Sequence, residues 1–210
     1  MSLPHHKRKD NMEHIASLSY GKDSLAMLEA IKILGLPLDR IVTAEVWATE
    51  TVPAEFPEMV EFKKKADQII LDRYGIQVEH FRSQNTYDSV FHMTRKDTGR
   101  MYGFPIVKGS WCVSYLKTSV LKKLELPNTV KYLGIAADEP KRIARHSGNA
   151  RLPLVEIGWD EAYCRKWCEE NDLLSPIYIL IPQEVDVSSA IIRDLNSCGY
   201  YERNTLICGR

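Results

Sequence analysis

A short apolar segment, followed at once by small polar residues and then by a helical pattern, constrains the fold of this chain most. Residues His14–Leu18 have the composition of a buried strand. After Ser19–Ser24, apolar residues recur at helical spacing until Gly35 and Pro37 end the predicted helix. In such a strand–turn–helix unit the first helical turn has free backbone N–H groups, and the positive end of the helix dipole points at the turn. A turn of this kind is suited to hold phosphate.

The side chains of this turn also suit an anion. Gly21 lets the backbone turn tightly, Ser19 and Ser24 offer hydroxyl donors, and Lys22 adds a positive charge. The whole turn reads Ser19-Tyr20-Gly21-Lys22-Asp23-Ser24. It resembles the Ser-Gly-Gly-x-Asp-Ser pyrophosphate loop (PP-loop) of the N-type ATP pyrophosphatases and phosphoadenosine phosphosulfate (PAPS) reductases, with Tyr20 in place of the first glycine. The alternative is an ordinary Asp-Ser helix cap after a glycine turn.

A second strand brings a further segment to the same edge. Arg40–Trp47 is predicted to be a buried strand, and the helix before it makes the two strands parallel. Ligands bind outside the carboxyl ends of such strands, so we expect Thr49 and Glu50 beside the turn. The resemblance implies the same, because the corresponding family segment lies near the nucleotide. The alternative is a polar loop before a helix that starts near Pro53.

The next pattern predicts a long amphipathic helix and a third strand. The helix covers Glu55–Tyr74 and ends at Gly75. Ile76–Phe81 alternates as a strand does. We expect Lys63-Lys64-Lys65 to form a solvated helix face and His80 to lie at the surface.

An irregular region and a helix follow. Ser83–Gly109 contains glycines, aromatic residues and basic residues, and we expect a mobile wall over a substrate. The predicted helix Ser110–Leu124 resembles a family segment with a cysteine and then Leu-Lys, which implies that Lys117 faces the phosphates. The alternative is a solvated helix lysine. Cys112 suits either a metal ligand or a small buried side chain.

A fourth strand ends in a second polar bend. Val130–Ala137 is predicted to be that strand. The residues after it resemble the family pattern Gly-Ile-x-x-Asp/Glu-x-x-x-Arg. This resemblance implies that Arg142 clamps the distal phosphates or sulfate with its planar guanidinium group. Asp138 or Glu139 would then hold a Mg²⁺ ion that bridges the phosphates.

The last part before the tail combines an extended piece with a helix. We expect Leu152–Gly158 to be extended and Trp159–Asn171 to be helical. Cys164 and Cys168 are one helical turn apart on one face. Aromatic residues around them favour a place in the core over a metal site.

The C-terminal residues 179–210 depart from the family. Leu173–Tyr178 matches a family phrase that leads to a glycine-rich Cys-x-x-Cys element, and that element is missing. Residues 181–190 can be encoded as ATT CCT CAG GAG GTG GAT GTT TCT TCT GCC, which two nucleotides later reads Ser-Ser-Gly-Gly-Gly-Cys-Phe-Phe-Cys. We therefore infer a frameshift near Tyr178–Ile181, and the alternative is a divergent tail. The nucleotide sequence of the gene decides between them.

The charge balance, the length of the apolar runs and the cysteine count disfavour some classes of function, above all binding to nucleic acid or to a membrane. The chain has 28 basic and 28 acidic residues, so no net field favours nucleic acid or a membrane surface. No apolar run approaches the ~20 residues of a membrane span. Five cysteines, an odd number, and no export signal predict reduced thiols in the cytoplasm.

These patterns predict one three-layer α/β domain over residues 1–178, with a mostly parallel sheet of about five strands. The resemblance implies an adenine nucleotide α-hydrolase-like fold and an ATP pyrophosphatase that uses Mg²⁺. It would split ATP between the α and β phosphates and adenylate a second substrate, which the sequence does not identify. The residues expected to act on the phosphates are Lys22, Asp23, Lys117 and Arg142. Those expected to bind the nucleotide are Ser19, Gly21, Lys22, Asp23, Ser24, Thr49, Glu50 and Arg142.

Two other classes of function stay open. A thioredoxin-dependent PAPS reductase needs a nucleophilic cysteine on a C-terminal tail. Cys198 stands next to a glycine but does not match the family signature Glu-Cys-Gly-x-His. The other class is a nucleotide-binding module without catalytic activity. The sequence does not set the oligomeric state.

Overall fold

The computed structural model describes residues 12–104, 111–124, 127–146 and 150–180. The predictions on the tail, including the frameshift and Cys198, lie outside these residues.

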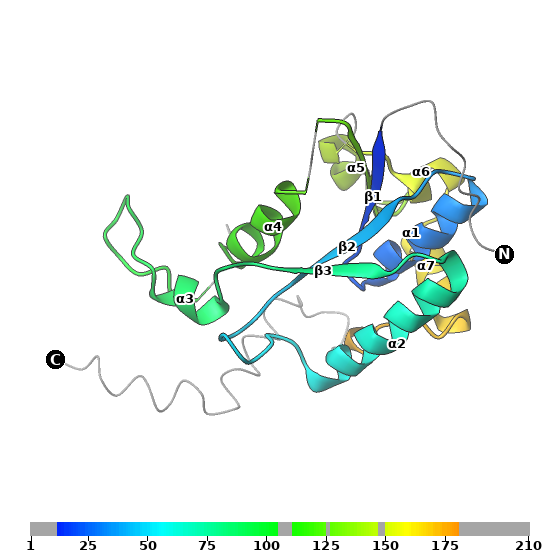
Figure 1. The fold of residues 1–210 in the computed structure, drawn as a ribbon. Helices are drawn as coiled ribbons and strands as arrows, with labels where there is room; N and C mark the ends of the chain where they lie inside the picture. Colours follow the sequence, from blue (N-terminus) through cyan, green and yellow to red (C-terminus); the bar gives the residue numbers. More distant parts are fainter. Residues whose placement is uncertain (1–11, 105–110, 125–126, 147–149, 181–210) are drawn as a thin grey trace.

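Four parallel strands form one sheet, which confirms the predicted α/β class (Figure 1). The strands are β1 (Glu13–Ser17), β2 (Arg40–Glu45), β3 (Val78–Arg82) and β4 (Thr129–Leu133). They lie in the order β3-β2-β1-β4, and each neighbouring pair is parallel. Ala16 of β1 lies opposite Ile41 of β2 and Tyr132 of β4, and all three are fully buried. The middle of the sheet is therefore core.

The prediction that Leu152–Gly158 is extended is wrong. For this reason the described residues form a sheet of four strands, where about five were expected. Pro153–Ile157 forms a short helix, α6, with the proline in its first turn. Gly158 follows in the left-handed conformation, with φ 75°. A proline at the start and a glycine just past the end are both helix signals. Just before this helix, Arg151 pairs with β4, through its N–H to the carbonyl of Lys131 (2.8 Å) and an isolated parallel bridge.

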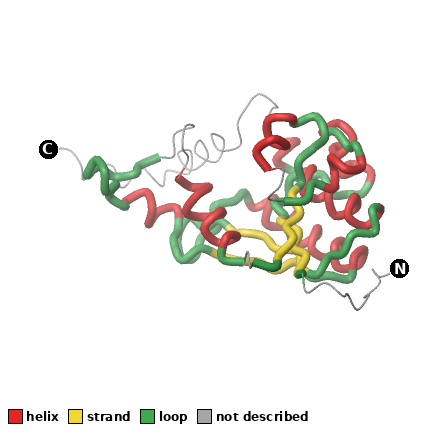
Figure 2. Tube along the Cα trace, turned by 90° about the horizontal axis from the view of Figure 1, so that it is seen from above, coloured by secondary structure: helices red, strands yellow, loops and turns green. Residues whose placement is uncertain are grey.

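Helices cover both faces of the sheet and complete three layers (Figures 1 and 2). On one face lie α1 (Lys22–Ile33), α2 (Pro57–Tyr74), α6 and α7 (Glu161–Glu170). On the other lie a π-helical turn, η1 (Val113–Thr118), and α4 (Ser119–Lys122). Right-handed crossovers explain this division, because the chain moves from β1 to β3 in one direction and then returns past β1 to β4.

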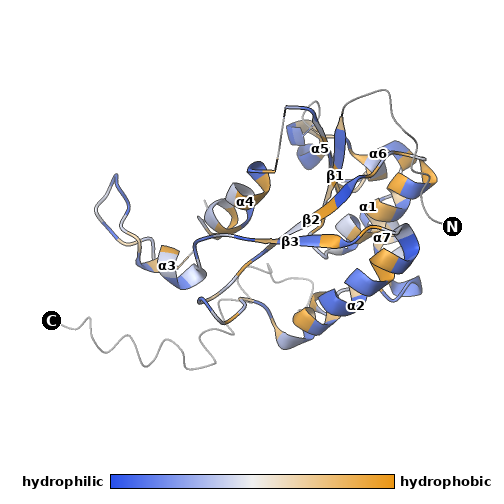
Figure 3. Cartoon of the chain, viewed as in Figure 1, coloured by the Kyte–Doolittle hydropathy of each residue, from blue (hydrophilic) through white to orange (hydrophobic). Residues whose placement is uncertain are grey.

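The main core lies between the sheet and the helices on the α1 side. α1 packs against both α6 and α7, so it is buried nearly all round. α2 shows hydrophobic and hydrophilic bands along its length, as expected of a helix with one side in the core (Figure 3). Gly75 ends α2 in the left-handed conformation, as predicted (φ 71°).

A smaller apolar cluster lies at the other end of the sheet. The predicted irregular region contains a helix, α3 (Tyr87–His92), whose N-terminus has a reciprocal capping box between Thr86 and Ser89. Tyr87, Val90, Trp111 and Leu116 pack together and join α3 to η1. The remaining helices are α5 (Pro140–His146) and α8 (Ile177–Leu180).

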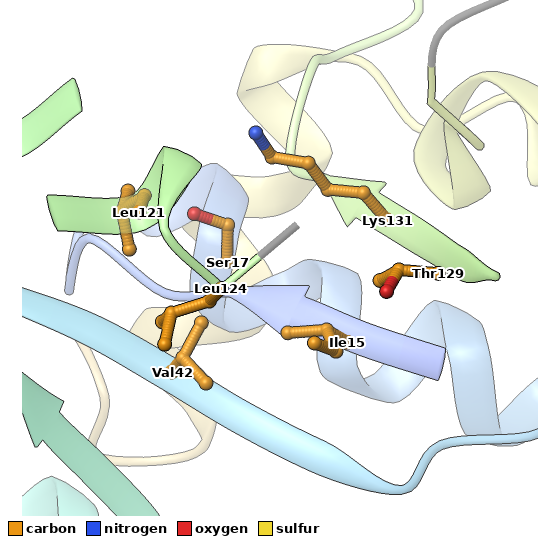
Figure 4. Close-up of a pocket in the computed structure, with 7 residues that line it drawn as sticks. All are labelled: Ile15, Ser17, Val42, Leu121, Leu124, Thr129 and Lys131. Carbon is orange, nitrogen blue, oxygen red and sulfur yellow. The ribbon is translucent and has the colours of Figure 1, made fainter. Parts of the chain in front are cut away.

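A small gap under α4 is too small for a ligand. It has a volume of about 10 Å³, which is room for about one water molecule. Figure 4 shows Leu121 and Leu124 facing Ile15 and Val42 across it. We interpret the gap as a packing defect.

Among the described residues, no helix has both the length and the apolar character needed to cross a bilayer.

Candidate functional site

The two predicted polar bends meet at the point where the strand order reverses. β1 and β4 are neighbours, yet the chain leaves β1 towards β2 on the opposite side. In open parallel sheets such a reversal leaves a crevice at the carboxyl ends of the strands, and ligands bind there. The Ser19–Ser24 loop follows β1, and the Gly134–Arg142 bend follows β4. Both therefore open at this crevice.

Gly134 brings the two bends into direct contact. A Cβ atom on this glycine would lie 2.7 Å from the carbonyl oxygen of Asp23 and 2.7 Å from the Cα atom of Ser24. The backbone after β4 thus packs on the first turn of α1 at a distance that no side chain permits.

The Ser19–Ser24 loop contains a tyrosine in an unusual backbone conformation. Tyr20 adopts a left-handed backbone conformation with φ 58°, where glycine is the usual residue. Gly21 precedes α1 and offers no side-chain cap to it. The Ser24 hydroxyl donates to the carbonyl of Gly21 (2.9 Å) and accepts from the N–H (3.2 Å) and hydroxyl (3.1 Å) of Ser19. The two serines therefore hold the loop closed upon itself.

Lys22 lies inside the site rather than at the surface. Its ammonium contacts Asp23 Oδ1 at 3.0 Å and Glu161 Oε2, on α7, at 2.9 Å. Burial alone would lower the pKa of Lys22, but the hydrogen bonds to Glu161 and Asp23 outweigh it and raise the pKa. Burial raises the pKa of Asp23, and the charge of Lys22 only partly opposes this. Lys22 is a fixed cation at the start of α1.

The second bend is tied to the first through Glu161. Asp138 Oδ1 accepts the backbone N–H of Glu161 (3.1 Å). Glu139 accepts two hydrogen bonds from Arg142 Nη1, at 2.6 and 2.7 Å, and one from the N–H of Ala136 (3.2 Å). Glu161 thus links Lys22 of the first bend to Asp138 of the second, while Glu139 and Arg142 pair with each other within the second bend.

The residues predicted to hold magnesium, Asp138 and Glu139, form a small donor set. Asp138 and Glu139 supply the carboxylate oxygens that Mg²⁺ prefers, but both already accept hydrogen bonds within the bend. No group of three or more His, Cys, Asp or Glu side chains that could hold a metal occurs among the described residues. These two carboxylates would need phosphate oxygens to complete a magnesium site.

Lys117 lies within electrostatic range of Lys63 and Glu55. It is exposed, on η1, and its pKa is lowered, chiefly because surrounding protein displaces part of its hydration. Glu55 opposes this shift and Lys63 adds to it. The predicted solvated face is wrong for Lys63, which is buried, pairs with Glu55 (2.5 Å) and lies 5.0 Å from the centre of the Tyr20 ring. Lys64 and Lys65 are exposed, as predicted.

Thr49 and Glu50 contact their own turn and Arg82. The Thr49 hydroxyl accepts the N–H of Val52 (3.1 Å), and the exposed Glu50 pairs with Arg82 (3.0 Å). Among the hydrogen bonds between described residues, none joins Thr49 or Glu50 to the Ser19–Ser24 loop. The loop that carries them does end at the same edge of the sheet, after β2.

A polar network beneath Tyr20 was not predicted. Tyr20 is buried, and its hydroxyl donates to Asp67 Oδ1 (2.5 Å). His80 is exposed, as expected, and it also bridges Asp67 Oδ2 (2.9 Å) and Glu45 Oε1 (2.8 Å). The hydrogen bond to Asp67 raises the pKa of His80, and partial burial opposes it. One feature of the sequence could have indicated this network: Tyr20 is a large residue at the position where the resembled pattern has its first glycine.

The same network lines a cavity of about 200 Å³ at the carboxyl ends of β2 and β3. The lining residues that carry charge come from the strands, from α2 and, in the case of Glu55, from the loop before α2. Trp47 and Pro53 supply apolar walls. Because Tyr20 belongs to the Ser19–Ser24 loop and binds Asp67, the cavity lies next to that loop.

Cys164 and Cys168 are core residues, as predicted. Both are fully buried, and the Cys168 thiol donates to the carbonyl of Lys22 (3.3 Å). Burial raises the pKa of each thiol to about 12. Both thiols are therefore protonated and unreactive at neutral pH. Cys112 is half-buried, and its role stays open.

Tyr178 reaches the loop from the far end of the described chain. Its hydroxyl lies 3.4 Å from the backbone nitrogen of Lys22, and the Lys22 ammonium lies 5.9 Å from the centre of its ring. The sequence around Tyr178 resembles a family phrase but does not predict that this tyrosine reaches the site.

Comparisons of the chain with models of known protein families and with curated proteins found no match.

Proposed function

We propose that this chain is a PP-loop protein of the PAPS reductase and N-type ATP pyrophosphatase type, and that it binds an adenine nucleotide at the Ser19–Ser24 loop. One observation carries the proposal. The N-terminus of α1, which has no side-chain cap, opens at the strand-order reversal in contact with the Gly134–Arg142 bend. Backbone N–H groups, the helix dipole and the Lys22 ammonium meet there, and Arg142 stands on the neighbouring bend. This combination suits phosphate.

The reaction we propose is cleavage of ATP between the α and β phosphates, with adenylation of a second substrate. Ser19, Gly21, Asp23 and Ser24 would cradle the pyrophosphate, and Lys22 and Arg142 would neutralise its charge. Chemistry of this kind depends mainly on positioning and on stabilising the charge of the transition state. Lys117 would act on the phosphates from η1. Magnesium, held by Asp138 or Glu139 and by phosphate oxygens, would supply further neutralisation.

The side chains of Lys22 and Arg142 are already paired with carboxylates, so a phosphate can bind them only in competition with these partners. Lys22 contacts Asp23 and Glu161, and Arg142 contacts Glu139. An incoming phosphate has to replace these partners or share them. A charge-assisted bidentate contact with Arg142 would compensate for the pair it breaks.

Binding of ATP with Mg²⁺, measured by isothermal titration calorimetry, tests the proposal. Arg142→Gln is the first variant, because Arg142 is half-exposed and its loss does not disturb the core. Lys22→Met is compared with Lys32→Met, which changes a lysine in the last turn of the same helix. We expect Arg142→Gln and Lys22→Met to weaken ATP binding at least tenfold, and Lys32→Met to leave it unchanged. Absence of ATP binding by the wild-type chain would overturn the proposal.

The products released from ATP and from PAPS distinguish the possible reactions. Pyrophosphate release from ATP, in the presence of a small-molecule cell extract as the source of acceptor, supports the adenylating enzyme. Sulfite release from PAPS with thioredoxin would identify a reductase instead. Binding without either product would leave a nucleotide-binding module.

A further inference from the structure

The hydroxyl of Tyr178 occupies the position where an anion would meet the first turn of α1. It lies 3.4 Å from the nitrogen of Lys22, and its distance from the ideal Cβ position of Gly21 is also 3.4 Å. Gly21 and Lys22 both belong to the predicted phosphate cradle. The hydroxyl therefore lies against two residues of the cradle.

The chain before Tyr178 is firmly held. Leu173 and Ser175 are fully buried, and the Ser175 hydroxyl donates to the sulfur of Met59 on α2 (3.0 Å). The N–H of Tyr178 then bonds to the carbonyl of Ser175 (3.1 Å). This anchored turn delivers the tyrosine ring to the loop from a point 156 residues away in the chain.

The contact itself is weak. A separation of 3.4 Å is beyond the usual 2.7–3.2 Å of an N–H···O hydrogen bond, and a neutral hydroxyl is the acceptor. A phosphate oxygen at the same N–H makes a shorter, charge-assisted bond of roughly twice the strength. A phosphate can therefore displace the hydroxyl, but it has to do so before it reaches Lys22.

We propose that Tyr178 is a gate on the Ser19–Ser24 loop: its hydroxyl competes with the phosphate groups for the N-terminus of α1 and moves away when they bind. This inference rests on the proposed function, since it assumes that the loop takes phosphate. The gate lowers the apparent affinity, because only the fraction of molecules with the hydroxyl displaced can bind.

Tyr178→Phe tests the gate, since it keeps the ring and removes the competing oxygen. The probes are inorganic pyrophosphate and ATP, each with Mg²⁺, titrated calorimetrically into the full chain. We expect Tyr178→Phe to bind both roughly threefold to tenfold more tightly than wild type, as the loss of one net hydrogen bond predicts. Tyr102→Phe is the matched control, because it removes a tyrosine hydroxyl hydrogen bond (to Tyr115, 3.0 Å) in the smaller apolar cluster.

The outcomes separate the two proposals. Tighter binding by Tyr178→Phe, with Tyr102→Phe like wild type, supports the gate. Equal or weaker binding by Tyr178→Phe overturns the gate and leaves the nucleotide proposal standing. If neither wild type nor Tyr178→Phe binds pyrophosphate or ATP, the nucleotide proposal fails and the gate fails with it.

Discussion

The ammonium of Lys22 and the carboxylate of Glu161 lie 2.9 Å apart, although 139 residues separate them in the chain. This pair joins the first turn of α1 to the first turn of α7 across the crevice between the two bends. It supplies the cation that the proposed phosphate site needs and, at the same time, a carboxylate that competes for it.

Glu161→Gln should free Lys22 for an anion. The carboxylate is half-exposed, so the pair contributes little to stability, and its removal should chiefly affect binding. We expect pyrophosphate to bind roughly twofold to fivefold more tightly, measured by titration calorimetry. Glu169→Gln, which breaks a pair with Arg165 on the same helix, is the control and should have no effect. Weaker binding by Glu161→Gln would mean that Glu161 positions Lys22 instead of competing for it.

Gly134→Ala should destabilise the fold by about 2 kcal/mol or more, because its Cβ would overlap the backbone of Asp23 and Ser24. Gly21→Ala is the matched comparison, since its Cβ meets only ordinary contacts at 3.4 and 3.6 Å and its φ is −80°. We expect Gly21→Ala to change the free energy of unfolding by less than about 1 kcal/mol. Urea denaturation measures both. Similar values for the two variants would contradict the close approach of the bends.

Tyr20→Gly should destabilise the protein even though it introduces the residue that the backbone conformation favours. Relief of the left-handed strain returns roughly 1–2 kcal/mol. Loss of a fully buried aromatic ring costs about 3–5 kcal/mol, and a glycine adds backbone entropy to the unfolded chain. The loss of the ring therefore outweighs the relief of strain. We expect the free energy of unfolding, measured by urea denaturation, to fall by about 2–4 kcal/mol. Increased stability of Tyr20→Gly would show that strain dominates at this position.

Stability should depend on the pH through His80. The pKa of His80 is raised in the folded state, mainly by the hydrogen bond between Nε2 and Asp67 and also by Glu45, which contacts Nδ1. The Tyr20 hydroxyl also faces Nε2, at 3.3 Å. The stabilisation is therefore fully present below the unfolded-state pKa of about 6.5 and is lost as the pH rises through the folded-state pKa. The measurement is the free energy of unfolding at a series of pH values from 5.5 to 9. His80→Gln should flatten the part of the profile that falls above pH 6.5, and an unchanged profile would exclude the bridge.

The local parts of the site could be predicted because their signals are contiguous. The unit from β1 through α1 and the bend after β4 each read directly from apolar runs, glycines and charged residues. The parallel sheet then places the two bends at one edge, so their meeting followed from topology. The helix at Pro153–Ile157 was missed although its proline and its closing glycine were both visible in the sequence.

The rest depended on contacts between distant segments. The helical period of α2 does not reveal that Lys63 lies over the Tyr20 ring, and the alternation of β3 does not reveal that His80 meets Asp67. Tyr178 reaches Lys22 only because an anchored turn positions it there. Such contacts follow from packing in three dimensions, which no local pattern encodes.

The pairing of Arg151 with β4 also bears on how the molecule behaves among its neighbours. An open strand edge is a template for strand addition and aggregation. On the β4 side, Arg151 takes up backbone groups of Lys131 and Leu133, so these groups are not free to pair with another strand. On the β3 side, the edge carries the charged residues Glu79 and Arg82, which disfavour the approach of another chain. Among the described residues, both edges of the sheet thus carry features that oppose the addition of strands from other copies.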